Sequence, residues 1–125
     1  MWLGEPDVAI ERVARAMRLS PLDPFTFLAQ GSIALAHFAA GRYEEALSWA
    51  QRSTREKPNF LSSIRILAAS CAMAGRQEDA QRAIARLRQL NPAFRVSDVR
   101  DIYRTSRLDD LVRYEQALRI AGLPE

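Results

Sequence analysis

Few residues of this chain could do covalent or acid–base chemistry. The sequence holds one histidine, His37, and one cysteine, Cys71, at a separation of 34 residues. A thiol beside an imidazole is a combination that nucleophilic catalysis uses, so one hypothesis is a Cys–His pair. The competing interpretation is that both residues fill equivalent core positions in two successive structural units. We favour this second interpretation.

Acidic pairs, phosphate loops and metal ligands give no stronger signal. Glu44–Glu45 and Asp109–Asp110 are adjacent acids, but neighbouring residues on a helix point in different directions, so neither pair forms an acid–base couple. The sequence has no phosphate loop of the Walker type and no dinucleotide-binding glycine fingerprint. With one histidine and one cysteine, a zinc site is not expected. We therefore expect no catalytic residues, no cofactor and no metal.

Length and composition predict a single soluble domain. The chain has 125 residues, of which 48% are apolar, and this is enough material for a core. The N-terminus lacks the basic start and apolar stretch of a signal peptide, and the apolar runs are too short or too interrupted to span a bilayer. A single cysteine cannot form an internal disulfide, which fits a reducing compartment. A cytoplasmic protein without membrane contact is expected.

The charge distribution argues against a nucleic-acid site. The formal net charge is +3, and only one of the 18 basic residues, Lys57, is a lysine. The arginines are spread along the chain among 15 acids, whereas a nucleic-acid site needs a concentrated basic stripe with stacking aromatics. Nucleic-acid binding is therefore the weakest of the hypotheses for function.

Three segments share one spacing of glycine, alanine and proline. In each segment, alanine follows glycine by five residues and proline follows alanine by twelve. The three sets are Gly4, Ala9 and Pro21; Gly41, Ala46 and Pro58; and Gly75, Ala80 and Pro92. Glycine adopts a positive φ at a helix end, a small alanine lets two helices approach closely, and proline ends the next helix. The spacing predicts repeated helix pairs.

This pattern resembles the tetratricopeptide repeat (TPR) family, whose period is 34 residues in two antiparallel helices. The glycines, Tyr43, the alanines and the closing prolines carry the resemblance over residues 1–92. It implies an all-α fold, a right-handed TPR-type α-solenoid with a C-terminal helical cap, in a single domain at 1–125. Its expected parts are a partial repeat at 1–24, repeats at 25–58 and 59–92, and a capping tail at 93–125.

Helix bounds follow from the same pattern. We expect helices at 7–20, 25–40, 43–56, 59–74 and 77–90. In the tail we expect a short helix from near Ser97, and a longer helix that starts with a capping box at Ser106 and ends near Ala121. The first repeat lacks most of its first helix, so apolar residues such as Val8 and Met17 would lack cover. This predicts a modest tendency to form homo-oligomers.

The tail also resembles a second group. Repeats followed by VSDVRDIYRTSRLDDLVRYEQALRIAGLPE look like the C-terminal region of bacterial regulators that carry an adenylate cyclase domain or a winged-helix domain upstream. The resemblance implies a regulatory or scaffolding part of a bacterial signalling protein. It implies no catalysis by this chain.

In TPR proteins the first helices of the repeats line a groove that binds a protein or peptide segment. The resemblance gives as groove residues Leu28, Gly31, Ser32, Leu35, Phe38, Ser62, Arg65, Ile66, Ala69 and Met73. Only Arg65 is basic, so a clamp for a carboxylate tail is not expected, and Phe38 and Met73 would be the apolar anchors. The alternative is a structural spacer or self-association module whose groove is filled by its own tail.

Overall fold

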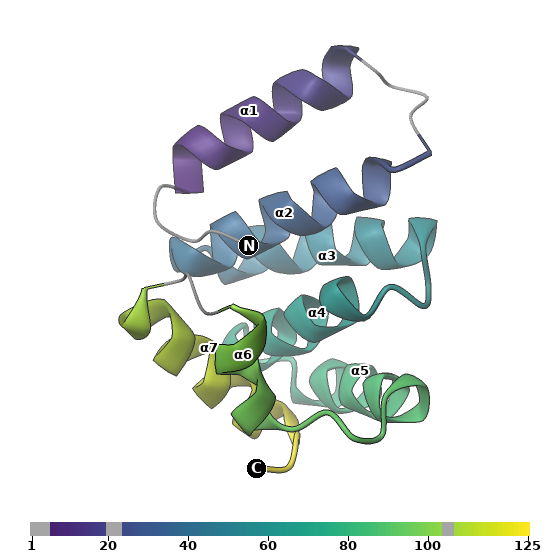
Figure 1. Ribbon diagram of the computed structural model, residues 1–125, viewed down its shortest axis with the longest axis vertical. Helices are drawn as coiled ribbons and strands as arrows, with labels where there is room; N and C mark the ends of the chain where they lie inside the picture. The colour runs from purple at the N-terminus through teal and green to yellow at the C-terminus, as the bar shows by residue number, and fades with distance from the viewer. Residues whose placement is uncertain (1–5, 20–23, 104–106) are drawn as a thin grey trace.

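The computed structural model describes residues 6–19, 24–103 and 107–125 (Figure 1). Over these ranges the chain forms seven α-helices and one short 3-10 helix, and no strand. They are α1 (Pro6–Leu19), α2 (Thr26–Ala39), α3 (Tyr43–Glu56), α4 (Leu61–Met73), α5 (Gln77–Leu90), η1 (Val96–Asp98), α6 (Val99–Ile102) and α7 (Leu108–Ala121).

The helices stack in chain order from α1 to α5, and each helix packs on the next (Figure 1). α2 and α3 form one antiparallel pair, and α4 and α5 form the other. The predicted all-α fold of antiparallel helix pairs is therefore confirmed for the described residues. α3 and α5 have the expected bounds, and α2 and α4 are shorter than expected by one or two residues at each end. The handedness of a solenoid stays a prediction.

The two turns within the pairs have the same geometry. Gly41 has a φ of 80° and Gly75 a φ of 79°, the left-handed region that glycine enters without a steric penalty. The next amide in each turn reaches back five residues, from Arg42 to the His37 carbonyl at 2.9 Å and from Arg76 to the Cys71 carbonyl at 2.8 Å. These bonds satisfy carbonyls that the helix end leaves open. The glycine prediction is confirmed at both turns.

Small residues mark the closest helix contacts. Ala46 and Ala80 are fully buried, as the repeat pattern predicts, whereas the side chain of Ala9 and all of Gly4 and Pro21 lie outside the described residues. A Cβ added to Gly31 would lie 2.9 Å from the Ser63 hydroxyl oxygen. α2 therefore approaches α4 as closely as a glycine allows.

The tail folds back onto the repeats. Figure 1 shows α7 beside α4, and it also contacts α5. The short helix expected near Ser97 begins at Val96, and the long helix ends at Ala121, as expected, with Gly122 as its C-cap at a φ of 110°. The N-cap of α7 is Arg107, without a side-chain cap bond, and Ser106 of the expected capping box lies outside the described residues. The 2.9 Å bond from the Val96 amide to the Pro124 carbonyl closes the tail on itself.

A search of the described helices finds none with the length and apolar character that crossing a membrane requires.

Candidate functional site

The ten predicted groove residues divide into two sets. Six are buried, namely Gly31, Leu35, Phe38, Arg65, Ile66 and Ala69. The other four reach the surface: Leu28 is 44% exposed, and Ser32, Ser62 and Met73 are partly exposed. The predicted groove is thus open at the start of α2 and closed further along it.

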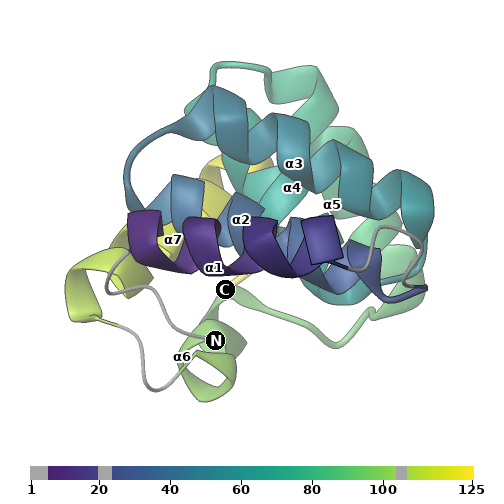
Figure 2. The same ribbon diagram turned by 90° about the horizontal axis from the view of Figure 1, so that it is seen from above.

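The C-terminal tail, residues 93–125, covers the buried half of the predicted groove. The ring centroid of Phe38 lies 5.4 Å from that of Tyr114 in α7. The ring centroid of Tyr103 lies 5.3 Å from that of Tyr114, so Tyr114 contacts both rings. Phe38 is 1% exposed, so the predicted anchor packs inside the molecule. Figure 2, the view from above, shows α7 beyond α2 on the side away from α1.

One arginine fastens α7 to the end of α2. Arg113 donates from Nη2 to the Ala39 carbonyl at 3.1 Å and to Asp110 Oδ1 at 2.8 Å. The carbonyls at a helix C-terminus carry partial negative charge, so a cation is favourable there. Asp110 is 8% exposed and would be costly without this arginine.

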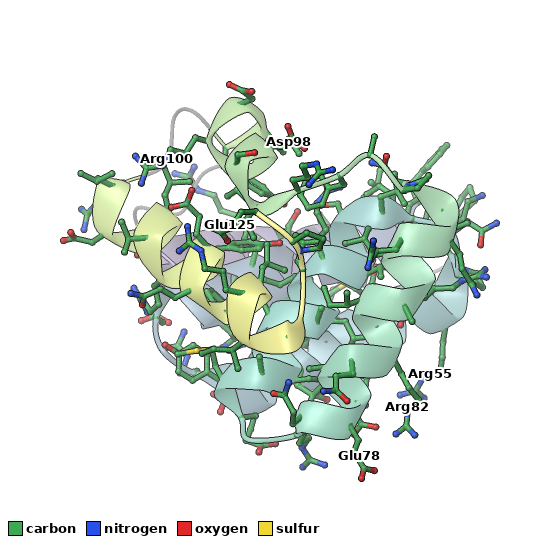
Figure 3. The ribbon with its side chains drawn as sticks, turned by 90° about the horizontal axis from the view of Figure 1, so that it is seen from below. Arg55, Glu78, Arg82, Asp98, Arg100 and Glu125 are labelled. Atoms are coloured by element: carbon green, nitrogen blue, oxygen red, sulfur yellow. The ribbon has the colours of Figure 1, made fainter. Side chains whose placement is uncertain are left out.

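A second ion-pair network fixes the rest of the tail (Figure 3). Arg100 of α6 makes two 3.1 Å bonds to the buried carboxylate of Glu115 in α7. Arg119 pairs with Glu125 at 2.7 Å. Two-pronged arginine–carboxylate bonds fix geometry as well as charge, so α6 and α7 are held in one arrangement.

The open half begins with two exposed apolar residues. Phe25 is 61% exposed and Leu28 is 44% exposed. Phe25 is the N-cap residue of α2, and Leu28 lies on the face of α2 that carries Ser32, whose hydroxyl donates to the Leu28 carbonyl at 3.0 Å. Val8 and Leu19 of α1 are also exposed, at 41% and 78%. The sequence-based prediction of groove residues did not include Phe25. The signal that could have identified it is its position, three residues before Leu28 and directly before the helix.

The histidine is engaged in a structural contact. His37 Nδ1 accepts a 2.9 Å hydrogen bond from Arg42 Nε, and Glu45 Oε2 lies 3.8 Å from the same nitrogen. Burial and the charge of Arg42 lower the pKa of His37, although Glu45 and Asp7 oppose them. An imidazole in this setting is neutral near pH 7 and already has a partner.

The cysteine sits in the equivalent turn of the next repeat. Cys71 is 1% exposed, and burial raises its pKa to about 11, with a smaller contribution from Asp79. The polar contacts of His37 are with Arg42 and Glu45, so its imidazole is engaged away from this thiol. This arrangement favours two core positions over a Cys–His pair.

Two acids in the first turns of helices form ion pairs with arginines of the next repeat. Arg76 Nη2 lies 3.2 Å from Glu44 Oε2, and Arg42 Nη2 lies 2.7 Å from Asp7 Oδ1. Each arginine follows a turn glycine, and each acid stands in the first turn of the preceding repeat's second helix. The contact therefore recurs from repeat to repeat. No group of three or more His, Cys, Asp or Glu suited to a metal occurs within the described ranges.

No protein-family model matches the chain, and a search of curated proteins finds no match.

Proposed function

We propose that this chain is a non-catalytic, TPR-type interaction module that binds a protein or peptide segment. The observation that carries the proposal is the pair of exposed apolar residues at the start of α2, Phe25 at the N-cap and Leu28 in the first turn. Aromatic and aliphatic side chains of this kind supply most of the binding energy when a partner covers them. Ser32 and Ser62, both partly exposed, provide polar groups beside them.

The repeat geometry supports the TPR-type assignment. The period of 34 residues, the two glycine turns with matching φ and the recurring arginine–acid contact all describe one unit used twice. The absence of a catalytic role is supported by the engagement of His37 and the raised pKa of Cys71. The wider setting that we propose is the cytoplasmic regulatory part of a bacterial signalling protein, and its support is the resemblance of the tail.

A photo-crosslinking experiment tests the binding site. A photoreactive residue replaces Leu28 in one chain and Gln81, an exposed residue of α5, in the control chain. A partner of the proposed site forms a cross-link from position 28 and not from position 81. Excess wild-type chain should suppress that cross-link, and excess Leu28→Asp chain should not. Equal labelling from both positions, or suppression by both competitors, would contradict the assignment.

The variants must leave the core intact. Phe38 and Arg65 were expected groove residues, but both are buried, so replacing them would disturb the fold before it reported on binding. Leu28→Asp changes an exposed side chain and should leave the helical content unchanged.

A second candidate is a spacer whose groove is filled by its own tail. The packing of Tyr114 and Arg113 against α2 favours it. Deletion of residues 94–125 distinguishes the two. A spacer would lose solubility without gaining any ligand, whereas newly acquired binding by the shortened chain would mean that the tail competes with a partner for the groove.

A further inference from the structure

Exposed large apolar side chains are distributed unevenly over the helices. Within the described ranges, the exposed positions of α3 and α5 carry none, as is typical of helices with one face in water. Helix α7 carries three, Leu108, Val112 and Ile120, and two of these are more than half exposed. Single apolar residues are ordinary on a protein surface, so the arrangement of the three decides what they mean.

The three residues form one row along the outside of α7. Together with exposed Gln116 they make an outward row of positions four residues apart, and such positions lie on one face of a helix. In Figure 3 no other helix lies in front of α7. The other side of the helix is buried against the rest of the chain through Leu111, Tyr114, Leu118 and Ala121. Apolar residues on both sides of a helix favour cover on both sides, and the outward row has none within the described chain.

Two charged residues flank the outward row, one near each end. Asp109 is exposed and makes no ion pair in the described part of the chain. Arg119 donates to Glu125 through Nε, at 2.9 and 2.7 Å, so its two terminal nitrogens have no hydrogen bond to a described residue. The row therefore has an unpaired acid near its start and a base with free donors near its end.

The outward row is complementary to itself when two copies of α7 run antiparallel. A twofold axis at the level of Tyr114 exchanges positions that lie equally far before and after that residue. Leu108 then lies at the level of Ile120 of the partner subunit, and Val112 at the level of Gln116 of the partner subunit. A shift by one helical turn in either direction loses the first of these matches. The apolar residues therefore select one register.

The flanking charges agree with the same register. Asp109 stands five residues before Tyr114 and Arg119 five residues after it, so the acid of each chain lies at the level of the partner subunit's Arg119. Attraction between exposed charges acts over about 8 Å at physiological salt, so it does not require direct contact. A parallel arrangement would bring acid to the level of acid and base to the level of base, which is unfavourable. The charges thus favour the antiparallel arrangement.

We propose that a second copy of this chain packs antiparallel on the outward row of α7 and forms a twofold-symmetric homodimer. Burial of the row on both chains supplies the favourable free energy, and the flanking charges fix direction and register. Each chain contributes one helix of 14 residues, so the interface is at the lower end of the size range and the dimer exchanges with the monomer.

This surface is separate from the site proposed for partner binding and from the uncovered side of α1. Leu28 lies at the start of α2 and Val8 in α1, and Figure 1 shows α1 at one end of the stack and α7 near the other. Leu28→Asp should therefore leave dimerisation unchanged. Failure of either proposal would not imply failure of the other.

Sedimentation of the whole chain over a range of concentrations, with two charge reversals, tests the inference. Asp109→Arg and Arg119→Asp each place like charges at the same level, so either variant alone should dimerise several-fold more weakly than the wild type. An equimolar mixture of the two variants restores opposite charges and should recover dimerisation as a heterodimer. Arg88→Asp, which reverses an exposed charge of α5, is the matched control and should behave as the wild type.

The apolar contribution is tested by Leu108→Gln combined with Ile120→Gln. Both side chains are exposed in the monomer, so the helical content should not change. Dimerisation should weaken by about tenfold or more, because the row then offers little apolar surface to bury.

A cross-link tests the register independently of the charges. In a Cys71→Ala background, chains with Leu108→Cys and chains with Ile120→Cys are mixed and treated with a short thiol cross-linker. The antiparallel register should join chains of different kinds. Chains of the same kind should not be joined, because the two copies of position 108 lie roughly 18 Å apart along the helix axis.

The inference is overturned if the wild-type chain stays monomeric at the highest soluble concentration. It is equally overturned if the mixed charge variants dimerise no better than either variant alone, or if the cross-links join chains of the same kind. A dimer that survives the two glutamine substitutions but is lost in Val8→Asp would place the interface on α1 instead. Should Arg119→Asp disturb the tail through loss of its bonds to Glu125, Asp109→Arg and the cross-link still decide the outcome.

Discussion

Arg76, directly after the turn glycine of the third repeat, reaches back to Glu44 in the first turn of α3, and their closest atoms are 3.2 Å apart. Arg42 makes the same contact with Asp7 one repeat earlier, at 2.7 Å. The acid at the corresponding place in the third repeat, Glu78, has no ion pair with a described residue and points outward in Figure 3. One interaction thus joins each described repeat to the next, and Glu78 provides an internal control.

We predict that Glu44→Gln lowers the free energy of unfolding by about 0.2–1 kcal/mol, because it removes one exposed ion pair between repeats. Glu78→Gln, at the matching position without an arginine opposite, should change it by less. Urea unfolding at low and moderate salt measures both, and the effect of Glu44→Gln should shrink as salt screens the pair. Equal losses for the two variants would mean that the contact contributes nothing specific.

The contact at Ala46 predicts a strong packing effect. Ala46→Leu inserts a larger side chain where two helices touch and should destabilise the fold by about 1–3 kcal/mol. Ala85→Leu, the same change at an exposed position of α5, should stay within about 0.5 kcal/mol of the wild type. Thermal and urea unfolding give the comparison. A tolerant Ala46 would show that the helices have more room than the structure indicates.

The setting of His37 predicts a dependence of stability on pH. Its pKa is lowered in the folded chain by burial and by Arg42, so the unfolded chain binds the proton more readily. The stabilising contribution is therefore present above the ordinary pKa of about 6.5 and declines as the pH falls below it. Denaturant unfolding between about pH 7.5 and 5.5 should show this decline. His37→Gln, which cannot titrate there, should show a flatter profile.

The burial of Cys71 predicts that its thiol reacts slowly with thiol reagents. Its side chain is buried and its pKa is raised to about 11, so little thiolate is present or accessible at pH 8. Labelling with a disulfide reagent should be far slower in the native chain than in urea. A cysteine introduced at exposed Ser48, in a Cys71→Ala background, should react at the rate of a free thiol. Rapid native labelling of Cys71 would indicate that the α4–α5 turn opens readily.

The repeat part of the fold could be predicted because its determinants are local. A positive φ at Gly41 and Gly75 depends on residue type alone, and the burial of Ala46 and Ala80 follows from their fixed distance to those turns. A helix end before a proline is equally local. The bounds of α3 and α5 therefore agree with the sequence-based expectation at both ends.

The closed half of the groove could not be predicted in the same way. It depends on contacts such as Arg113 with Ala39, which are 74 residues apart, and on the rings of Phe38 and Tyr114. The apolar residues of α7 recur at helical spacing, but this spacing does not show which surface they cover. Leu108 shares the spacing of Leu111 and is nevertheless 60% exposed. The acids buried with the tail, Asp110 and Glu115, read as ordinary surface residues until their arginines are located.

The bond between the Val96 amide and the Pro124 carbonyl has a consequence during synthesis of the chain. The repeats are complete when residue 92 leaves the ribosome. The surface around Phe38 and Ile66 is buried only after α7 and the residues that follow it have been synthesised. Until then this apolar surface is accessible to chaperones and to other nascent chains. Slow translation of residues 93–125 would therefore prolong the period in which this surface is most prone to aggregate.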